Sequence, residues 1–460
     1  MESTPSAGPG GLALRSLTVT MPLPPLMGRG LPVLGHFPYI HGLGVDSFAF
    51  FLEGYRQHGR VFAVRDMKDT FAVLLGPEAH RFVLERETPH LSWGAAYGEE
   101  GSRVMGPTAM PLLDGEEQRR RRTPMMSAFR HQNIAAFGDT LVELARAQSA
   151  GWREGQPLDF LGEMSELTFR VACGFLLGVE IGEDYPRFRD IYKKMFRPVG
   201  LAMQAAGLPY MQRYRDALGR MSAKWIADRR AHPCDDIISR LLEAGLDDKD
   251  VMAQVLVLMF AGHDTTKLSL TWAMALLLRH PEYLARVLAE QDEVLGDGPI
   301  AAEALKRLPV LERAIRETHR LYPPASLLRR GVLEEFELGG YTIPKGWKVM
   351  YLPRVSHHLP DVFKEPERYD PDRFAPPREE HKQPYAMVEF GGGHRTCIGK
   401  ELAMFEAKGV LSFLLRTFRF ELVPGQRLEA SNSGAMTSPR YGLKVRVKPT
   451  GRSVPLARAA

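Results

Sequence analysis

The stretch FGGGHRTCIGK, residues 390–400, is the part of this chain from which the fold can be inferred. It places one thiol, Cys397, in a glycine-rich loop with Arg395 two positions earlier, and the residues that follow read as a helix. Glycines let a backbone approach a flat cofactor and adopt positive φ. Backbone N–H groups and the N-terminus of the coming helix stabilise negative charge on sulfur. The loop therefore suits a thiolate ligand, one of the axial ligands that proteins give to haem iron.

The loop also matches a known signature. Phe390, Gly393, Arg395, Cys397 and Gly399 together resemble the haem-binding motif of the cytochrome P450 family. Five such matches in one window arise by chance in about one chain in ten thousand, whereas a lone Cys before a helix is more often an inert buried residue. The resemblance implies haem b as cofactor, Cys397 as the metal ligand, Phe390 and Gly399 beside the haem, and Arg395 on a propionate.

Composition indicates an ordinary globular protein. The chain has 460 residues, of which 44% are hydrophobic and 25% charged, and its net charge is +5 with a pI near 9.0. That charge is too weak to indicate nucleic-acid binding without a concentrated basic patch. Three cysteines, Cys173, Cys234 and Cys397, make a disulfide framework unexpected and fit a reducing compartment.

The chain reads as a helical body with small sheets. Strands are expected over residues 60–75, 338–351 and 443–447, and helices through most of residues 116–317, one of them from Asp250 to His280. This is a mainly α fold with small β-sheets (α+β), which the resemblance identifies as the single-domain P450 fold. We expect a Pro/Gly-rich and partly mobile segment at residues 1–30, a catalytic domain at 31–450 and a flexible tail at 451–460.

No membrane anchor is expected. The apolar residues between 11 and 27 are interrupted by Arg15 and by three prolines, whereas a membrane span needs about 20 apolar residues. P450s of eukaryotic membranes normally begin with an anchor, so the resemblance implies a bacterial, cytoplasmic and monomeric member.

A second motif, AGHDTT, occupies residues 261–266 inside a long helical pattern. Thr265 shares a helix face with Ala261, and Gly262 costs about 1 kcal/mol relative to Ala, so it needs a packing or functional reason. Taken alone, the motif is as well explained by a Thr-induced kink with a surface Asp. It resembles the P450 helix above the haem, which implies that Thr265 hydrogen-bonds the oxygen at the iron, that Asp264 relays protons and that Ala261 and Gly262 leave room for oxygen and substrate.

A third motif, ETHRLYPP, begins at Glu317. Glu317 and Arg320 share a helix face and can pair, although such a pair on a surface contributes little. Its position before the Cys loop resembles the ExxR helix of the P450 family, whose partner Arg corresponds here to Arg373 in the PDRF stretch. The resemblance implies that these three residues lock the core and take no part in catalysis.

Haem propionates need cations, and two further arginines are candidates. Arg122 ends a run of four arginines and is predicted to point inward while its neighbours point outward. The family usually has Trp or His four residues before that Arg, but this chain has Gln118, which puts the paired contact in doubt. Arg329 and Arg330 compete for the third position, and their spacing to the next strand favours Arg330.

Apolar residues in three segments are together predicted to line a substrate pocket, although plain core packing is the commoner explanation for each one taken singly. They are Leu91, Trp93, Tyr97, Val104, Met105, Met110 and Leu112; Met195, Phe196, Val199, Leu201, Met203, Leu208, Tyr210 and Met211; and Ala325, Leu327 and Leu328. They favour a lipophilic small-molecule substrate of terpenoid, steroid, retinoid or fatty-acyl type.

The sequence thus predicts a haem-thiolate monooxygenase that activates O2 and hydroxylates or epoxidises its substrate. The chain is too short for a fused reductase, so electrons from NAD(P)H would arrive through a ferredoxin or flavodoxin and its reductase. Two alternatives remain. One is a peroxide-driven peroxygenase on the same fold, which the Asp264–Thr265 pair disfavours, and the other is a non-enzymatic haem-thiolate sensor.

Overall fold

A computed structural model describes residues 21–43, 46–85, 89–178, 184–195, 208–433 and 435–457. Its helices are α1 (Phe37–Ile40), α2 (Ser47–His58), α3 (Gly76–Glu85), α4 (Trp93–Met105), α5 (Gly115–Ala128), α6 (His131–Ala136), α7 (Gly138–Ser149), α8 (Phe160–Leu177), α9 (Tyr185–Met195), α11 (Leu208–Ala231), α12 (Ile237–Glu243), α13 (Asp248–Arg279), α14 (Pro281–Leu295), α15 (Ala302–Leu305), α16 (Pro309–Leu321), α17 (Pro353–Ser356) and α18 (Lys400–Thr417). Short 3₁₀ turns are η1 (Met110–Leu112), η2 (Pro371–Phe374), η3 (Glu380–Lys382) and η4 (Gly393–Arg395).

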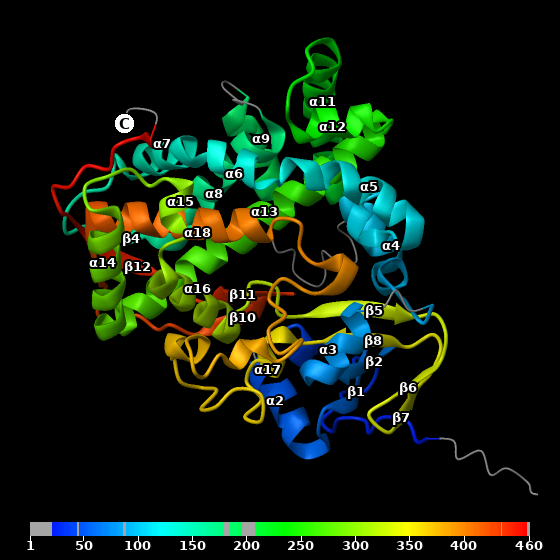
Figure 1. The fold of residues 1–460 in the computed structure, drawn as a ribbon. Helices are drawn as coiled ribbons and strands as arrows, with labels where there is room; N and C mark the ends of the chain where they lie inside the picture. The colour runs from blue at the N-terminus through cyan, green and yellow to red at the C-terminus, as the bar shows by residue number, and fades with distance from the viewer. Residues whose placement is uncertain are drawn as a thin grey trace, which may run out of the picture.

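The strands are β1 (Val61–Asp66), β2 (Asp69–Leu74), β3 (Leu91–Ser92), β4 (Pro157–Asp159), β5 (Leu328–Val332), β6 (Phe336–Leu338), β7 (Tyr341–Ile343), β8 (Lys348–Tyr351), β9 (Phe418–Leu422), β10 (Ala430–Ser433), β11 (Met436–Pro439) and β12 (Lys444–Pro449). Figure 1 shows the helical body above a smaller lobe that contains β1, β2, β8 and β5. The predicted mainly α fold with small sheets in one domain is confirmed.

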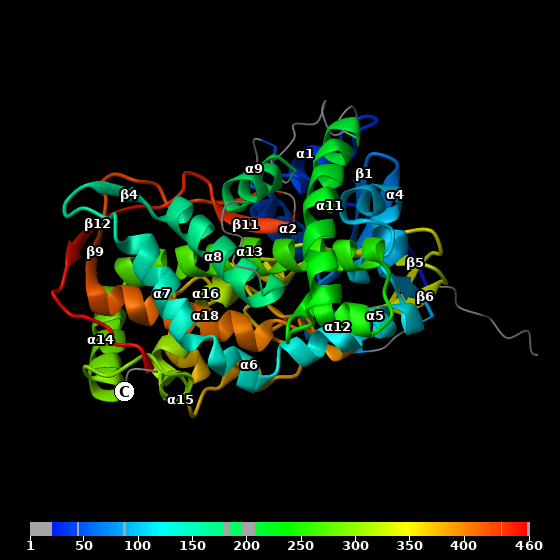
Figure 2. The same cartoon turned by 90° about the horizontal axis from the view of Figure 1, so that it is seen from above.

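The long helix α13 is the centre of the helical body. The Asp247 side chain caps its start by accepting a hydrogen bond from the Asp250 N–H, and the helix ends at Arg279, two residues before Pro281. Most of its residues are buried, as expected of a helix that is surrounded by others. It packs against α8, α16 and α18, and Figure 2 shows α11 lying across it.

The largest sheet has the strand order β1-β2-β8-β5-β3. β1 and β2 form the predicted antiparallel pair, with Val61 opposite Leu74, and their consecutive buried residues show that both faces of the sheet are covered. β1 would be an open edge, but residues 25–36 run beside it. Met27 N–H binds the Ala63 carbonyl at 2.8 Å, and His36 N–H binds the Arg65 carbonyl at 2.6 Å.

The chain end packs against the helical body. Val454 is buried, and its carbonyl accepts a hydrogen bond from Arg146 Nη2 at 2.5 Å. The Ala457 N–H binds Asp139 Oδ1 at 2.7 Å. Residues 451–457, which we predicted as part of a flexible tail, therefore dock on α7, while 458–460 lie outside the described residues.

None of the helices in the described ranges is long and apolar enough to cross a bilayer. Residues 1–20 of the predicted mobile segment lie outside the described part of the chain.

Candidate haem site

The Cys loop, from Phe390 to Cys397, contains η4 and leads into α18, and it is closed by a backbone hydrogen bond. Cys397 N–H binds the Phe390 carbonyl at 2.9 Å, so the two residues that begin and end the loop lie together. Gly393 has φ +59°, and a Cβ there would lie 2.0 Å from the Leu84 carbonyl oxygen of α3. Only glycine fits this position. A Cβ on Gly399 would lie 3.9 Å from Cys397 Sγ, so Gly399 keeps the space beside the sulfur open.

Cys397 keeps solvent-accessible surface as a residue, but many protein atoms surround its thiol, and they affect its titration. Burial raises the pKa of the Cys397 thiol, and the Gly399 backbone, Arg122 and Lys400 oppose this effect only in part. The loop alone therefore does not hold a thiolate at neutral pH. Cys397 would be held as a thiolate by a bound metal cation, which would supply the missing positive charge.

Phe390 and the neighbouring α16 support the loop from one side. The Phe390 ring packs edge-on against His319, with ring centroids 5.7 Å apart, and His319 Nε2 lies 2.6 Å from Ser269 Oγ of α13. Burial lowers the pKa of His319 to about 4, so the imidazole is neutral at physiological pH. These contacts join the loop, α16 and α13 in one packed unit.

The predicted distal residues lie in the middle of α13. Ala261 is exposed and Thr265 half-buried, although the preceding residues 255–259 are all buried. Thr265 Oγ1 donates to the Ala261 carbonyl at 2.5 Å, and Thr266 Oγ1 donates to the Gly262 carbonyl at 2.7 Å. One face of this otherwise covered helix is therefore open at Ala261 and Thr265.

Asp264 is buried and already bonded. Its Oδ2 accepts a hydrogen bond from the Tyr192 hydroxyl of α9 at 3.0 Å, and its Oδ1 pairs with Lys267 one turn along α13. Burial, followed by the Asp264 carboxylate, raises the pKa of Tyr192 well above its usual value, so Tyr192 remains a donor. Tyr192 was not among the predicted site residues, because nothing in its local sequence distinguishes it from a core aromatic.

Glu317, Arg320 and Arg373 form a buried ion cluster in which all three side chains are 0% exposed. Arg320 donates from Nε and Nη2 to the two Glu317 oxygens at 2.8 and 2.9 Å. Arg373 Nε reaches Glu317 Oε1 at 3.1 Å. Other N–H groups of the same two guanidinium groups donate to the carbonyls of His357, Lys364 and Arg368. The cluster joins α16 to η2 and to the chain after α17.

Two predicted propionate ligands approach the Cys loop from α5 and η4. Arg122 is half-buried, and its Nη2 donates to the Thr396 carbonyl at 2.5 Å. Arg395 Nη2 binds the Leu113 carbonyl at 2.6 Å and Asp114 Oδ1 at 2.8 Å. Arg122 thus contacts the residue just before the thiol, and Arg395 lies two positions before it.

Arg330 lies on β5 and is only 3% exposed. Its guanidinium stacks on the Trp93 ring at 3.7 Å, and its Nη1 donates to the Arg329 carbonyl at 2.7 Å. Arg395 is 5.9 Å from the same ring. Trp93 Nε1 is a buried donor that has no acceptor among the described residues. An unpaired N–H beside guanidinium groups fits the carboxylates of a haem.

The structure corrects one expectation for the arginine run. Arg119 and Arg120 are exposed, but Arg121 is buried and pairs with Asp250 of α13 at 3.0 Å and with Glu117. The prediction that all neighbours of Arg122 point outward is therefore wrong for Arg121, because its partner Asp250 is distant in sequence.

Gln118 is fully buried at the position where the family usually has Trp or His. Its Nε2 lies 3.5 Å from Met110 Sδ, and its Oε1 has no hydrogen bond within the described ranges. It lies on the same helix as Arg122 and presents a polar group without a strong partner.

The predicted pocket residues lie in different parts of the structure. Leu112, Tyr97 and Met105 pack with Ala253 and Val257 of α13. Met195 and Leu327 are buried in the main cores. Leu91 and Leu328 pack in the sheet core, Met110 packs against the main core, and Ala325 pairs with Met436. Phe196, Val199, Leu201 and Met203 lie outside the described residues, as do the side chains of Val104, Leu208, Tyr210 and Met211.

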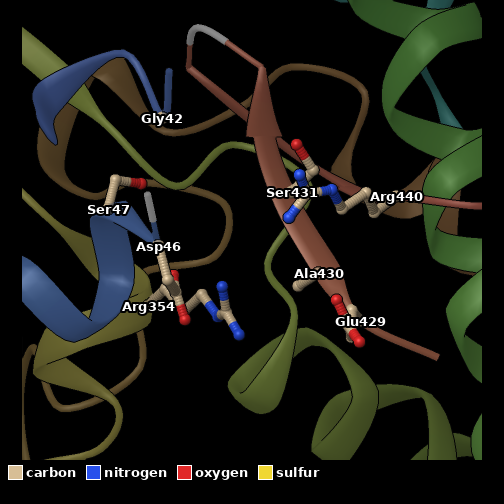
Figure 3. Close-up of a pocket in the computed structure, with 8 residues that line it drawn as sticks. All are labelled: Gly42, Asp46, Ser47, Arg354, Glu429, Ala430, Ser431 and Arg440. Atoms are coloured by element: carbon tan, nitrogen blue, oxygen red, sulfur yellow. The ribbon is translucent and has the colours of Figure 1, made fainter. Parts of the chain in front are cut away.

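A separate polar cleft of about 340 Å³ lies between α2, α17 and the β10–β11 hairpin. Figure 3 shows Arg354 and Arg440 extending into it from opposite sides. None of the residues that line it is a predicted site residue, so this cleft is distinct from the Cys loop.

Known proteins with similar sequences and folds show which family this chain belongs to. The cytochrome P450 family model matches residues 24–445. Cyclooctat-9-en-7-ol 5-monooxygenase of Streptomyces melanosporofaciens is 32% identical over 419 residues, which cover 86% of this chain and 90% of that protein. Sterol 14alpha-demethylase of Mycolicibacterium vanbaalenii is 29% identical, over 82% of this chain and 87% of that protein.

Among solved structures, retinoic acid-bound cyanobacterial CYP120A1 superimposes with a TM-score of 0.83 and 29% identity, over 94% of this chain and all of that one. The family model spans most of the chain and includes both the Cys loop and the predicted distal residues of α13. This chain therefore belongs to the cytochrome P450 family of haem-thiolate monooxygenases.

Proposed function

We propose that this P450 hydroxylates or epoxidises a lipophilic small molecule of terpenoid, sterol, retinoid or fatty-acyl type, with electrons from NAD(P)H delivered through a separate ferredoxin or flavodoxin and its reductase. The observation that carries the proposal is that the same fold holds a closed Cys397 loop and an open face of α13 at Ala261 and Thr265. The substrate class is supported by relatives that are named sterol 14alpha-demethylase and cyclooctat-9-en-7-ol 5-monooxygenase.

Haem, when bound, supplies dioxygen activation and the oxidant. In the proposal, Cys397 is its axial ligand, and Arg122, Arg330 and Arg395 bind its propionates. Trp93 adds a neutral donor, since its Nε1–H is buried without an acceptor in the described part of the chain. A buried guanidinium needs a counter-charge, because an unpaired buried charge is strongly destabilising, and a propionate would supply one.

Proton transfer is the proposed task of Asp264 and Thr265. Thr265 Oγ1 currently donates to the Ala261 carbonyl, so rotation of its hydroxyl frees the hydrogen for a bound ligand. Both oxygens of Asp264 are engaged, by Tyr192 and Lys267. Each carboxylate oxygen has a second lone pair that can accept a further hydrogen bond, so Tyr192 and Lys267 orient Asp264 without blocking it.

Thr265→Ala is expected to uncouple electron use from product formation. The hydroxyl that orients a proton is lost, so product per NADPH consumed falls by about tenfold or more and hydrogen peroxide rises. Thr266→Ala is the matched control, because Thr266 makes the same type of bond to Gly262 but is 4% exposed. If the two variants formed the same amount of product per NADPH consumed, Thr265 would be excluded from the relay.

The substrate class is tested by spectral titration of the holoprotein with terpenes, sterols, retinoids and fatty acids. A ligand that displaces water from the iron shifts the Soret band, and the same ligand should yield an oxygenated product with ferredoxin, reductase and NADPH. Faster turnover with hydrogen peroxide alone would instead favour a peroxygenase. Ligand shifts without any product would favour a sensor.

Exposed Arg119 and Arg120 on α5 neighbour Arg122, which contacts the Cys loop. We propose that they help dock an acidic ferredoxin or flavodoxin by electrostatic steering.

Arg120→Glu is expected to slow reduction of the haem iron by an acidic ferredoxin several-fold at low ionic strength, and the difference should shrink as salt is added. Stopped-flow absorbance measures this rate. Arg427→Glu is the matched control, since Arg427 is 74% exposed and lies between β9 and β10. If ferredoxin reduces the haem iron of both variants at the same rate, the docking face is not at α5.

A further inference from the structure

A buried guanidinium, that of Arg354 in α17, borders the polar cleft between α2, α17 and the β10–β11 hairpin. Arg354 is only 8% exposed, and its guanidinium carbon lies 4.2 Å from the centre of the Phe48 ring and 5.1 Å from that of Tyr322. Its Nε donates to the Leu321 carbonyl at 3.2 Å, but its Nη1 is buried without an acceptor in the described part of the chain. Burial lowers the pKa of Arg354, and nearby groups oppose this effect only in part.

Other deeply buried arginines show what Arg354 lacks. Arg320 donates to both carboxylate oxygens of Glu317. Arg416 is 2% exposed, and both of its terminal nitrogens donate to backbone carbonyls between α14 and α15. A buried cation without such partners is strongly destabilising. The unpaired Nη1 of Arg354 beside a cleft therefore indicates that a group from outside the chain completes its surroundings.

The facing wall of the cleft adds a second cation. Arg440, directly after β11, is exposed and extends into the cleft from the side opposite Arg354 (Figure 3). Ser47, the first residue of α2, lines the cleft as well, so the N-terminus of this helix adds partial positive charge. The volume of about 340 Å³ is enough for a small molecule.

Two acids, Asp46 and Glu429, also line the cleft, but each has another partner. Asp46 Oδ1 accepts a hydrogen bond from the Phe48 N–H at 2.9 Å and so caps α2. Glu429 Oε1 lies 4.0 Å from Arg427 Nη1. Both acids are exposed, so solvent and salt screen their charges, whereas the guanidinium of Arg354 is buried. Neither acid therefore fully neutralises Arg354.

We propose that this cleft binds a small molecule through an oxyanion group, a phosphate or a carboxylate, with Arg354 as the buried anchor and Arg440 contacting the anion from the opposite wall. A guanidinium binds either group through two parallel N–H bonds, which the terminal nitrogens of Arg354 can supply. The site is separate from the Cys loop, and the inference is independent of the proposed substrate and redox partner.

The test is isothermal titration calorimetry of the holoprotein with inorganic phosphate and, separately, with succinate, in a chloride buffer of low ionic strength. Arg354→Met keeps an aliphatic stem against Phe48 but loses the charge-assisted hydrogen bonds, so we expect at least about tenfold weaker binding. Arg440→Gln, at an exposed position, should weaken binding several-fold without affecting the fold. Arg427→Gln is the matched control, since Arg427 is 74% exposed and does not line the cleft, and its affinity should equal that of the wild type.

Thermal unfolding gives a second readout. In phosphate-free buffer Arg354→Met should unfold at the wild-type temperature or above it, because the variant removes a buried charge that lacks a full counter-charge. Phosphate should then raise the unfolding midpoint of the wild type and leave that of Arg354→Met unchanged, compared with chloride at equal ionic strength.

Three results would overturn the proposal. The first is a wild-type protein that binds neither phosphate nor succinate. The second is equal affinity in the wild type, Arg354→Met and Arg440→Gln, since the anion would then bind elsewhere. The third is a shift of the Soret band on addition of phosphate, which would place the anion at the haem. If Arg354→Met does not fold, Arg440→Gln decides by itself. Binding of phosphate alone would identify the ligand as a phosphate ester, and binding of succinate alone would identify it as a carboxylate.

Discussion

Cys397→Ser is expected to abolish the band near 450 nm that the reduced, CO-bound protein should show, because that band requires thiolate ligation. The loop around the residue stays intact, since the Cys397 N–H to Phe390 carbonyl bond involves backbone atoms only. Serine therefore occupies the same place with an oxygen that ligates iron poorly at neutral pH. Haem should also transfer to apomyoglobin at least about tenfold faster, since the axial bond is lost.

The pKa of the thiol adds a second readout. Burial raises the pKa of Cys397 above its ordinary value, so the haem-free chain carries a neutral thiol at pH 7. Binding of haem iron must then displace a proton, and haem uptake by the wild type should release a proton that the Cys397→Ser variant does not release. Cys234→Ser is the control, because Cys234 is exposed and lies between α11 and α12. A variant at Cys397 that kept the band would disprove the assignment of the ligand.

Local sequence patterns predicted the parts of the fold that local physics determines. The helix expected from Asp250 to His280 is α13, Asp248–Arg279, because its capping residue and the Pro that follows it are close in sequence. The strands expected over residues 60–75 are β1 and β2, joined by a short turn. The same holds for the Cys loop, whose glycines and thiol lie within one short stretch.

Contacts between distant segments could not be predicted in the same way. Trp93 read as a pocket residue, but it stacks with Arg330, which is far along the chain on β5. Arg121 read as a surface cation because its partner Asp250 is 129 residues away. The bond between Tyr192 and Asp264 likewise depends on how α9 packs on α13. Each of these contacts requires the tertiary arrangement, for which a single sequence has no local signal.

Glu317→Gln is expected to destabilise the protein by about 3–5 kcal/mol, because it leaves buried guanidinium groups without their counter-charge. Glu317 accepts hydrogen bonds from Arg320, from Arg373 and from the Asp370 N–H. An amide can accept at one atom only, so at least one of these donors faces an N–H₂ group. The free energy of unfolding is measured by urea denaturation of the holoprotein, followed by circular dichroism.

Two comparisons separate this effect from ordinary charge removal. Glu303→Gln removes an acid that pairs with Lys306 and His131 but is 74% exposed, and it should leave the unfolding midpoint unchanged because solvent screens such a pair. Arg373→Met should cost less than Glu317→Gln, since Glu317 then keeps Arg320 while Glu380 keeps Arg378. If Glu317→Gln unfolded at the same urea concentration as Glu303→Gln, the cluster would not stabilise the core, and its three fully buried charges would need another explanation.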